Sequence, residues 1–330
     1  MGKKYLAIIS LILFFSNNPA WSGFNKVGTS GAQFLKLGVG ARGTSLGGAF
    51  AALTDDAEAA YWNPAGLAVI EKREVNFSHL FWIAEVSLDA LIYAQKFSRL
   101  GTFALSFIQL GTKDMAVTTT QQQEGTGEMF TYRDQAIGLS YSRYLSDAFS
   151  VGLTMKYIDE QIYSYHARGL AFDVGTQYQT GLYGMSLAFV IRNFGQDLRF
   201  KGSYMNTKVV QGTNTMLSEE RYLVAFPLPL QFVAGIRYDI LDNDFIRARV
   251  AVDALHFNDY SERIHLGAET WFKDILALRA GYKFNYREEG LSLGLGLKST
   301  HHSFLIKLGY AYSDLGVFQD VHSFSIDFTF

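Results

Sequence analysis

Apolar and polar residues alternate along most of the chain after residue 72. In residues 278–286 every second side chain is apolar, and Arg279, Gly281 and Lys283 stand between them. Residues 291–298 read Leu-Ser-Leu-Gly-Leu-Gly-Leu-Lys and repeat the pattern. A period of two with one apolar face is typical of a β-strand. The pattern therefore predicts strands across this region.

We predict about 14 such strands, each close to the length that a tilted strand needs to cross a membrane. Connections after even-numbered strands are short, whereas the two longest, residues 112–130 and 194–222, follow the third and seventh strands. Long loops at one end and tight turns at the other are typical of outer-membrane barrels. The expected strands are residues 73–82, 85–98, 101–111, 131–145, 148–159, 168–180, 182–193, 228–240, 244–256, 261–272, 275–287, 290–298, 302–313 and 320–330.

A soluble β-sandwich is the alternative fold for alternating strands. The barrel is favoured by the 15% of aromatic residues and by the final stretch HSFSIDFTF, in which Phe324, Ile326, Phe328 and Phe330 share one face. A barrel chain that ends on an aromatic residue resembles the targeting signal read by the outer-membrane barrel assembly machinery. We predict an all-β fold, a transmembrane antiparallel β-barrel over residues 73–330.

The first residues predict export. Two lysines precede an apolar run over residues 5–15, and the small residues Ala20 and Ser22 stand before the expected cleavage point. These features are typical of a cleaved signal peptide, which we place at residues 1–22. We expect the mature protein in the outer membrane of a Gram-negative-type bacterium, in contact with outer-membrane lipid.

Composition argues against several classes of function. The formal net charge is −2 and the chain has no basic run, so we expect no nucleic-acid partner. With 0 Cys there is no thiol nucleophile, disulfide or thiolate metal site. No His stands in an H-x-x-x-H helix or beside a Ser in a nucleophile-elbow pattern. We expect no enzymatic activity, no cofactor and no metal site.

Residues 23–72 do not read as a strand. Gly38, Gly40 and Gly43 have the spacing of a dinucleotide-binding loop, but no hydrophobic strand precedes them, so we do not expect a nucleotide there. The segment is compact and rich in small residues, and it lies immediately before the first expected barrel strand. We therefore predict that it folds inside the barrel as a plug.

Within this segment, a short helix is predicted over residues 57–62. Asp55 and Glu58 have the spacing of a capping box, with Asp in place of Ser or Thr. Asn63 precedes Pro64, and a residue before proline is pushed out of the helical region. We therefore expect the helix to end there.

Residues 32–68, AQFLKLGVGARGTSLGGAFAALTDDAEAAYWNPAGLA, resemble the N-terminal signature of the PorV/PorQ outer-membrane family, which is similar to the FadL long-chain fatty-acid transporters. Those transporters are 14-stranded barrels whose N-terminal hatch contains Asn-Pro-Ala. The resemblance places a hatch motif here on Asn63, Pro64, Ala65 and the following Gly66. The plug residues that we single out are Gly38, Gly40, Arg42, Gly43, Asp55, Asp56, Asn63, Pro64, Ala65 and Gly66.

The resemblance implies a non-enzymatic plugged barrel with one of two functions. The first is a scaffold or cargo-handling accessory in type IX protein secretion, with secretion-system proteins as partners. The alternative is gated transport of hydrophobic small molecules such as fatty acids. The chain is shorter than typical fatty-acid transporters, and most of its outer loops are short, so we expect the first.

Charged residues recur on the faces that we assign to the barrel interior. They could form a basic lumen that attracts anionic head groups, or a ladder of ion pairs that fills a narrow barrel, since buried charges must be paired. Arg42 in the plug could likewise contact a bound carboxylate, or pair with Asp55, Asp56 or the wall. The candidate lumen charges are Arg237, Arg247, Arg249, Asp253, Arg263, Glu269, Arg279 and Lys283.

Aromatic residues near strand ends predict a girdle at the boundary between lipid and water, where amphipathic rings prefer to lie. A sugar-binding platform is the alternative interpretation. These residues are Tyr144, Tyr157, Trp271, Phe272, Tyr286, Tyr310, Tyr312 and Phe330.

Overall fold

The computed structural model describes residues 26–210, 213–301, 304–318 and 320–330, so the expected signal peptide lies outside the described residues. Fourteen antiparallel strands form a closed barrel, in which β1 pairs with β18 and β8 pairs with β9. The barrel strands are β1 (Arg73–Phe81), β2 (Ser87–Phe97), β3 (Gly101–Gly111), β6 (Tyr132–Ser146), β7 (Phe149–Ile162), β8 (Tyr165–Gln179), β9 (Met185–Gly195), β12 (Gln231–Asp242), β13 (Ile246–Phe257), β14 (Arg263–Phe272), β15 (Leu276–Phe284), β16 (Leu291–His301), β17 (Phe304–Ser313) and β18 (Val321–Thr329). The predicted fold is confirmed.

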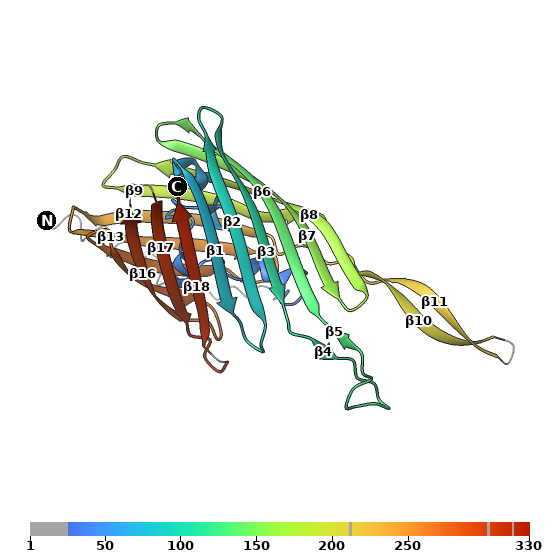
Figure 1. The fold of residues 1–330 in the computed structure, drawn as a ribbon. Helices are drawn as coiled ribbons and strands as arrows, with labels where there is room; N and C mark the ends of the chain where they lie inside the picture. Colours follow the sequence, from blue (N-terminus) through green and yellow to red (C-terminus); the bar gives the residue numbers. More distant parts are fainter. Residues whose placement is uncertain (1–25, 211–212, 302–303, 319) are drawn as a thin grey trace.

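The two ends of the barrel differ, as the loop lengths predict. We call the end with the long connections the loop end and the other the turn end. The third barrel connection contains the short strands β4 (Met115–Ala116) and β5 (Met129–Phe130). The seventh contains β10 (Lys201–Val210) and β11 (Thr213–Tyr222), a hairpin that projects beyond the barrel (Figure 1). Neither connection has the alternating pattern of a barrel strand, and no strand is predicted there from the sequence.

The outward face of the wall carries a row of apolar side chains that consists of register partners on successive strands. One row of register partners crosses six strands and is at least 37% exposed at every position, namely Phe77, Leu91, Phe107, Ile137, Tyr157 and Leu170. The next row toward the loop end is polar along the same six strands and consists of His79, Asp89, Gln109, Gln135, Asp159 and Arg168. An apolar band with a polar edge is what a lipid-facing barrel surface requires.

The C-terminal strand completes the closure of the barrel. Phe324 and Phe328 are exposed on the outward face of β18, while Ser323 and Ser325 are buried on the inward face. The backbone of the terminal Phe330 exchanges hydrogen bonds of 3.0 and 3.1 Å with Arg73. The wall therefore has no free edge between β18 and β1, as lipid surroundings demand.

The segment before β1 fills the lumen. It contains the 3₁₀-helices η1 (Gln33–Lys36) and η2 (Pro64–Val69) and the short helices α2 (Ala41–Ser45) and α3 (Ala59–Trp62). Its apolar residues, such as Phe50, Leu53 and Leu67, are fully buried in one core with inward residues of the wall. No helix in the described part of the chain is long and apolar enough to cross a membrane.

Glycines in the wall let the plug backbone approach closely. A Cβ atom built on Gly152 of β7 would lie 2.2 Å from the carbonyl carbon of Pro64. One built on Gly281 of β15 would lie 2.1 Å from the amide nitrogen of Gly47. Contacts this short exclude any side chain at these two positions. The plug backbone therefore packs directly against the wall at β7 and at β15.

Candidate functional site

The glycine triplet makes room for two plug side chains. A Cβ on Gly40, which has φ +83°, would lie 2.1 Å from the carboxyl group of Glu58, and one on Gly43 would lie 2.5 Å from the indole of Trp62. The Trp62 Nε1–H donates a 2.8 Å hydrogen bond to the carbonyl oxygen of Val39. The dinucleotide spacing therefore serves packing inside the plug.

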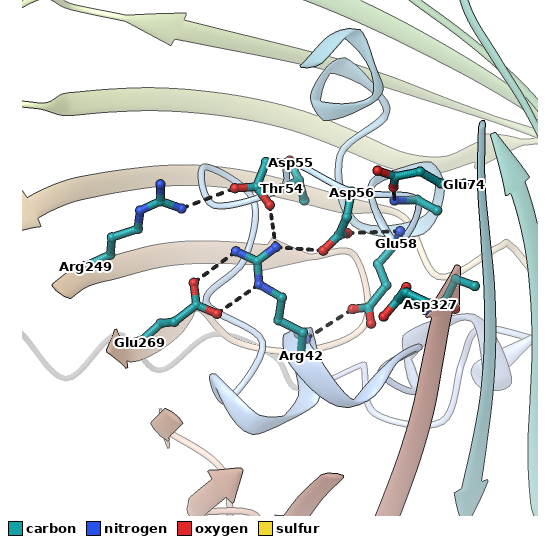
Figure 2. A network of polar contacts seen from close by, with 12 residues as sticks. Arg42, Thr54, Asp55, Asp56, Glu58, Glu74, Arg249, Glu269 and Asp327 are labelled. Atoms are coloured by element: carbon teal, nitrogen blue, oxygen red, sulfur yellow. Dashed lines mark hydrogen bonds and ion pairs between the residues drawn. The ribbon is translucent and has the colours of Figure 1, made fainter. Parts of the chain in front are cut away.

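Arg42 lies at the centre of a buried ionic network that joins the plug to the wall (Figure 2). Its Nε donates to Glu269 Oε2 at 2.9 Å and its Nη2 to Glu269 Oε1 at 3.0 Å, which is a bidentate pair. Its Nη1 donates to Asp56 Oδ2 at 2.6 Å and to Asp55. Arg249 reaches Asp55 from β13 at 3.2 Å. Of the two interpretations of Arg42, the structure shows the paired one.

This network fixes the charge states of its plug members. Burial opposes the charge on Arg42, but Asp55, Glu269 and Asp56 outweigh it and raise the Arg42 pKa well above its usual value. Burial also opposes the charge on Asp55, but Arg42 and then Arg249 outweigh it and hold the Asp55 pKa below its usual value. The plug is therefore attached to the wall by ions that remain charged at neutral pH.

Glu58 is held differently, although it lies beside the same network. It is 1% exposed, and among the described residues its carboxylate accepts a single hydrogen bond, donated by the Gly43 amide at 3.3 Å. Burial, followed by repulsion from Asp56 and Asp327, raises the Glu58 pKa well above its usual value. The predicted capping box is absent, because Asp55 is used by Arg42. Asp56 Oδ1 accepts the Glu58 amide instead, and the helix begins at residue 59 rather than 57.

The Asn-Pro-Ala motif ties the plug to β8. Asn63 Oδ1 accepts the Ala65 amide at 3.1 Å and caps η2, with Pro64 at its first position. Asn63 Nδ2 donates to the carbonyl oxygens of Ala51 in the plug and Thr176 in β8, at 2.8 and 3.2 Å. Gly66 packs on Thr54, because a Cβ built on Gly66 would lie 2.3 Å from the Thr54 hydroxyl oxygen. Each residue of the motif has a role in docking the plug.

The eight candidate lumen charges all lie on the inward side of the wall, and most are paired. Glu269 is shared by Arg42 and Arg279, and Asp253 Oδ2 accepts two plug amides at 2.9 Å. Arg237 and Arg249 lie 3.3 and 3.4 Å from Asp239. Arg247 contacts Asp242 and Asp274, and Lys283 contacts Glu289. Arg263 has no ion pair within the described residues.

A cavity of about 430 Å³ lies between the plug and the loop end; we call it the loop-end cavity. Phe34 and Trp62 of the plug and Leu80, Leu255 and Phe257 of the wall supply much of its apolar lining. A smaller cavity of about 210 Å³ lies on the turn side of the Arg42 network and is lined largely by charged residues. The plug therefore separates two chemically different compartments.

Of the residues predicted to belong to the aromatic girdle, Trp271 and Tyr286 lie inside the barrel, and Tyr144 has the inward parity of the buried Ser140 and Ser142 on β6. Trp271 is 8% exposed, and Arg279 lies 5.4 Å from its ring centroid. Tyr286 lines the loop-end cavity, and its hydroxyl is 2.8 Å from His265 Nε2. For Tyr286 the reason is that β15 ends at Phe284 and Asn285 adopts φ +65°, which ends the alternation. Trp271 has the same inward parity as Glu269 on β14.

Residues 29–36, which we call the strap, run across the mouth of the loop-end cavity. The Lys36 ammonium contacts Asp259, in the connection after β13, at 2.6 Å, and the Gly31 amide donates to the Pro227 carbonyl at 3.0 Å. Glu160 of β7 accepts the Ala32 amide at 3.0 Å. Burial lowers the pKa of Lys36, partly offset by Asp259. The strap therefore connects the plug to opposite sides of the mouth.

Sequence reasoning missed Arg192 and Lys36, two cationic residues of this cavity. Arg192 stands on β9 at the same parity as the small residues Ser186 and Ala188, which face inward. That parity was a usable signal. Lys36 gave none, because nothing local indicates that the strap would meet Asp259, more than 200 residues away in the chain.

Comparisons with solved structures give the same fold. The "CymD monoaromatic hydrocarbon channel" matches at 17% identity with a TM-score of 0.61, covering 89% of this chain and 98% of that one. The toluene transporter TodX of Pseudomonas putida matches at 12% identity and TM-score 0.57, covering 89% and 99%. A Pseudomonas aeruginosa FadL homologue matches at 12% and 0.53, covering 88% and 98%. At these identities the likeness concerns the fold.

Sequence comparison places the chain in a family. A search of curated protein sequences gives no match. A family model, described as "Uncharacterised protein family (UPF0164)", matches residues 18–220, which is more than half of the chain. The protein is thus a FadL-like 14-stranded barrel by fold, and it belongs to the UPF0164 family.

Proposed function

We propose that this protein mediates gated passage of hydrophobic small molecules across the outer membrane. The observation that carries the proposal is the loop-end cavity, a space of about 430 Å³ between the plug and the mouth of a closed barrel. Concave, largely apolar sites with a few polar groups are typical of small-molecule binding. Similarity of fold to hydrocarbon channels and a FadL homologue supports this function over the secretion scaffold that we first expected.

The proposed location follows from the surface of the barrel. The exposed apolar rows would cost much free energy in water, and the wall is a closed sheet in which each barrel strand pairs with a neighbour on both sides. A ligand would enter from the loop end, which we place outside the cell. It would remain above the plug until the plug shifts or the wall admits it.

The plug would act as the gate. Its Arg42 network and the glycine contacts of the wall hold it in place, so the closed state is the one with these contacts formed. In proteoliposomes, deletion of residues 31–68 should raise leakage of small solutes. Because that deletion could impair folding, Arg42→Gln serves as a second variant and should raise leakage to a smaller extent. Unchanged permeability in a folded deletion variant would contradict the proposal.

A second candidate function is the secretion scaffold. It is favoured by the β10–β11 hairpin, which extends past the loop end, and by the connection that carries β4 and β5 (Figure 1). In this case the long connections would contact a protein partner. Removing residues 113–129 should then abolish partner capture while the barrel remains folded. Intact capture would exclude this surface.

A further inference from the structure

The loop-end cavity contains more positive charge than its ion pairs neutralise. Four cationic side chains line it, and two of them have partners. Lys36 contacts Asp259 and Lys283 contacts Glu289. In the part of the chain that the structure describes, Arg192 and Arg263 form no ion pair.

Arg192 is buried, and its polar atoms are not satisfied by protein groups. It is 6% exposed, and both Nε and Nη1 have no hydrogen-bond partner within the described residues. Its guanidinium carbon lies 5.5 Å from the ring centroids of both Tyr61 and Trp62, so the plug holds its position. The register partner of Arg192 is Gln231, whose Oε1 is also without a partner.

Arg263 lies on β14, which is separated from β9 and Arg192 by the two strands β12 and β13. Its guanidinium group also lies against aromatic rings. Its guanidinium carbon lies 3.7 Å from the Tyr286 ring centroid and 4.1 Å from that of Tyr260. Its Nε likewise has no hydrogen-bond partner among the described residues. Arg192, Arg263 and His265 all line the loop-end cavity.

The nearby carboxylates are engaged elsewhere. Asp134 lines the cavity and accepts the Tyr132 hydroxyl, and within the described residues it forms no ion pair with either arginine. Asp253 is within reach of Arg192, but it accepts two plug amides through Oδ2. A buried charged group without a partner is costly, and a guanidinium group is shaped to bind oxyanions through two hydrogen bonds.

We propose that the loop-end cavity binds amphiphiles whose polar end carries two negative charges, such as a phosphate monoester. Arg192 and Arg263 bind the oxygens, and the apolar part lies against side chains such as Leu80, Leu110 and Leu255. This inference rests on the proposed function and specifies its substrate class. A plain hydrocarbon would cover both guanidinium groups without supplying an anionic partner to either.

The test uses three ligands that share one alkyl chain: dodecyl phosphate, dodecanoate and dodecanol. Binding to the full-length protein in lipid nanodiscs is measured at about pH 8, where the phosphate monoester is dianionic. The signal is tryptophan fluorescence, because Trp62 and Trp82 line the cavity. We expect dodecyl phosphate to bind at least tenfold more tightly than dodecanoate, and dodecanoate more tightly than dodecanol.

Variants assign the effect to the two residues. Arg192→Gln and Arg263→Gln should each weaken dodecyl phosphate binding at least tenfold and leave dodecanol binding unchanged. Arg133→Gln is the matched control, because Arg133 is exposed on the outward face near the loop end. The inference would be overturned if the three ligands bound equally, or if both variants preferred dodecyl phosphate as strongly as the wild type does. Either result would leave the proposed passage of hydrophobic molecules standing. If none of the three bound, the proposed function would fail as well.

Discussion

At the scale of single residues, the plug is held by a few buried charges and by glycines at contact points. Arg42 satisfies three carboxylates, and Gly40 gives Glu58 the space that it occupies. Each of these positions has a counterpart on the surface that differs in burial but matches in charge or in residue type. Comparing a substitution at the buried position with the matching substitution at its surface counterpart separates the effect of the contact from the effect of the residue change.

Removing the Arg42 charge should destabilise the plug strongly. In Arg42→Met, Glu269 and Asp56 would remain buried without their Arg42 partner, and breaking a buried pair costs about 3–5 kcal/mol. Urea unfolding monitored by tryptophan fluorescence measures the loss. Lys113→Met is the control, because Lys113 and Glu85 form an ion pair with side chains 80% and 73% exposed. A loss in Arg42→Met no larger than in the control would contradict this role.

Gly40→Ala should be more harmful than Gly127→Ala. Both glycines have positive φ, +83° and +89°, so the backbone strain of an alanine is similar. Gly127 has nothing within 4 Å of its built Cβ, whereas the Cβ on Gly40 would overlap the Glu58 carboxyl group. The difference between the two free energies of unfolding isolates this steric contact. Equal losses would show that the plug accommodates the methyl group.

Glu58 should make plug stability depend on pH. Its folded pKa is raised by burial above the ordinary value of about 4.3, so the folded state binds more protons than the unfolded state between these two values. Stability is therefore lost as pH rises through this window. Glu58→Gln keeps the shape but does not ionise, so its urea midpoint relative to wild type should rise between about pH 5 and pH 8. A constant difference would argue against a raised pKa.

At the scale of elements, the barrel strands follow directly from the period-two pattern, because every second residue faces lipid. The hairpin β10–β11 was not predicted, because its sequence does not repeat the period-two pattern. The plug helices are set by tertiary contacts rather than local signals. Asp55 pairs with Arg42, so it does not form the capping box that its spacing from Glu58 predicts.

The strap offers a direct test of movement at the mouth. The chain has 0 Cys, and a Cβ built on Gly31 would lie 3.4 Å from the Phe226 Cβ, close to the spacing of a disulfide. The Gly31→Cys/Phe226→Cys variant should cross-link on oxidation. Uptake of a hydrophobic tracer should then fall and recover on reduction, while each single Cys variant is unaffected. Full uptake by the completely cross-linked protein would show that the strap need not move.

At the scale of the whole molecule, the chain combines a lipid-facing wall, a docked plug and a cavity at the loop end. The wall could be predicted from the alternation of apolar and polar residues. The plug could be predicted from the resemblance of residues 32–68. The cavity was not, since Lys36, Arg192 and Tyr286 come together only when distant strands close into a barrel. The candidate lumen charges lie on the inward side of the wall, but register alone does not tell which charges lack partners.

Native mass spectrometry of the protein extracted from outer membranes in mild detergent tests the central claim most directly. We predict one bound amphiphilic small molecule per chain, which is lost when Leu255→Trp fills the loop-end cavity. An empty cavity together with a stoichiometric protein partner would contradict passage of small molecules and favour the scaffold.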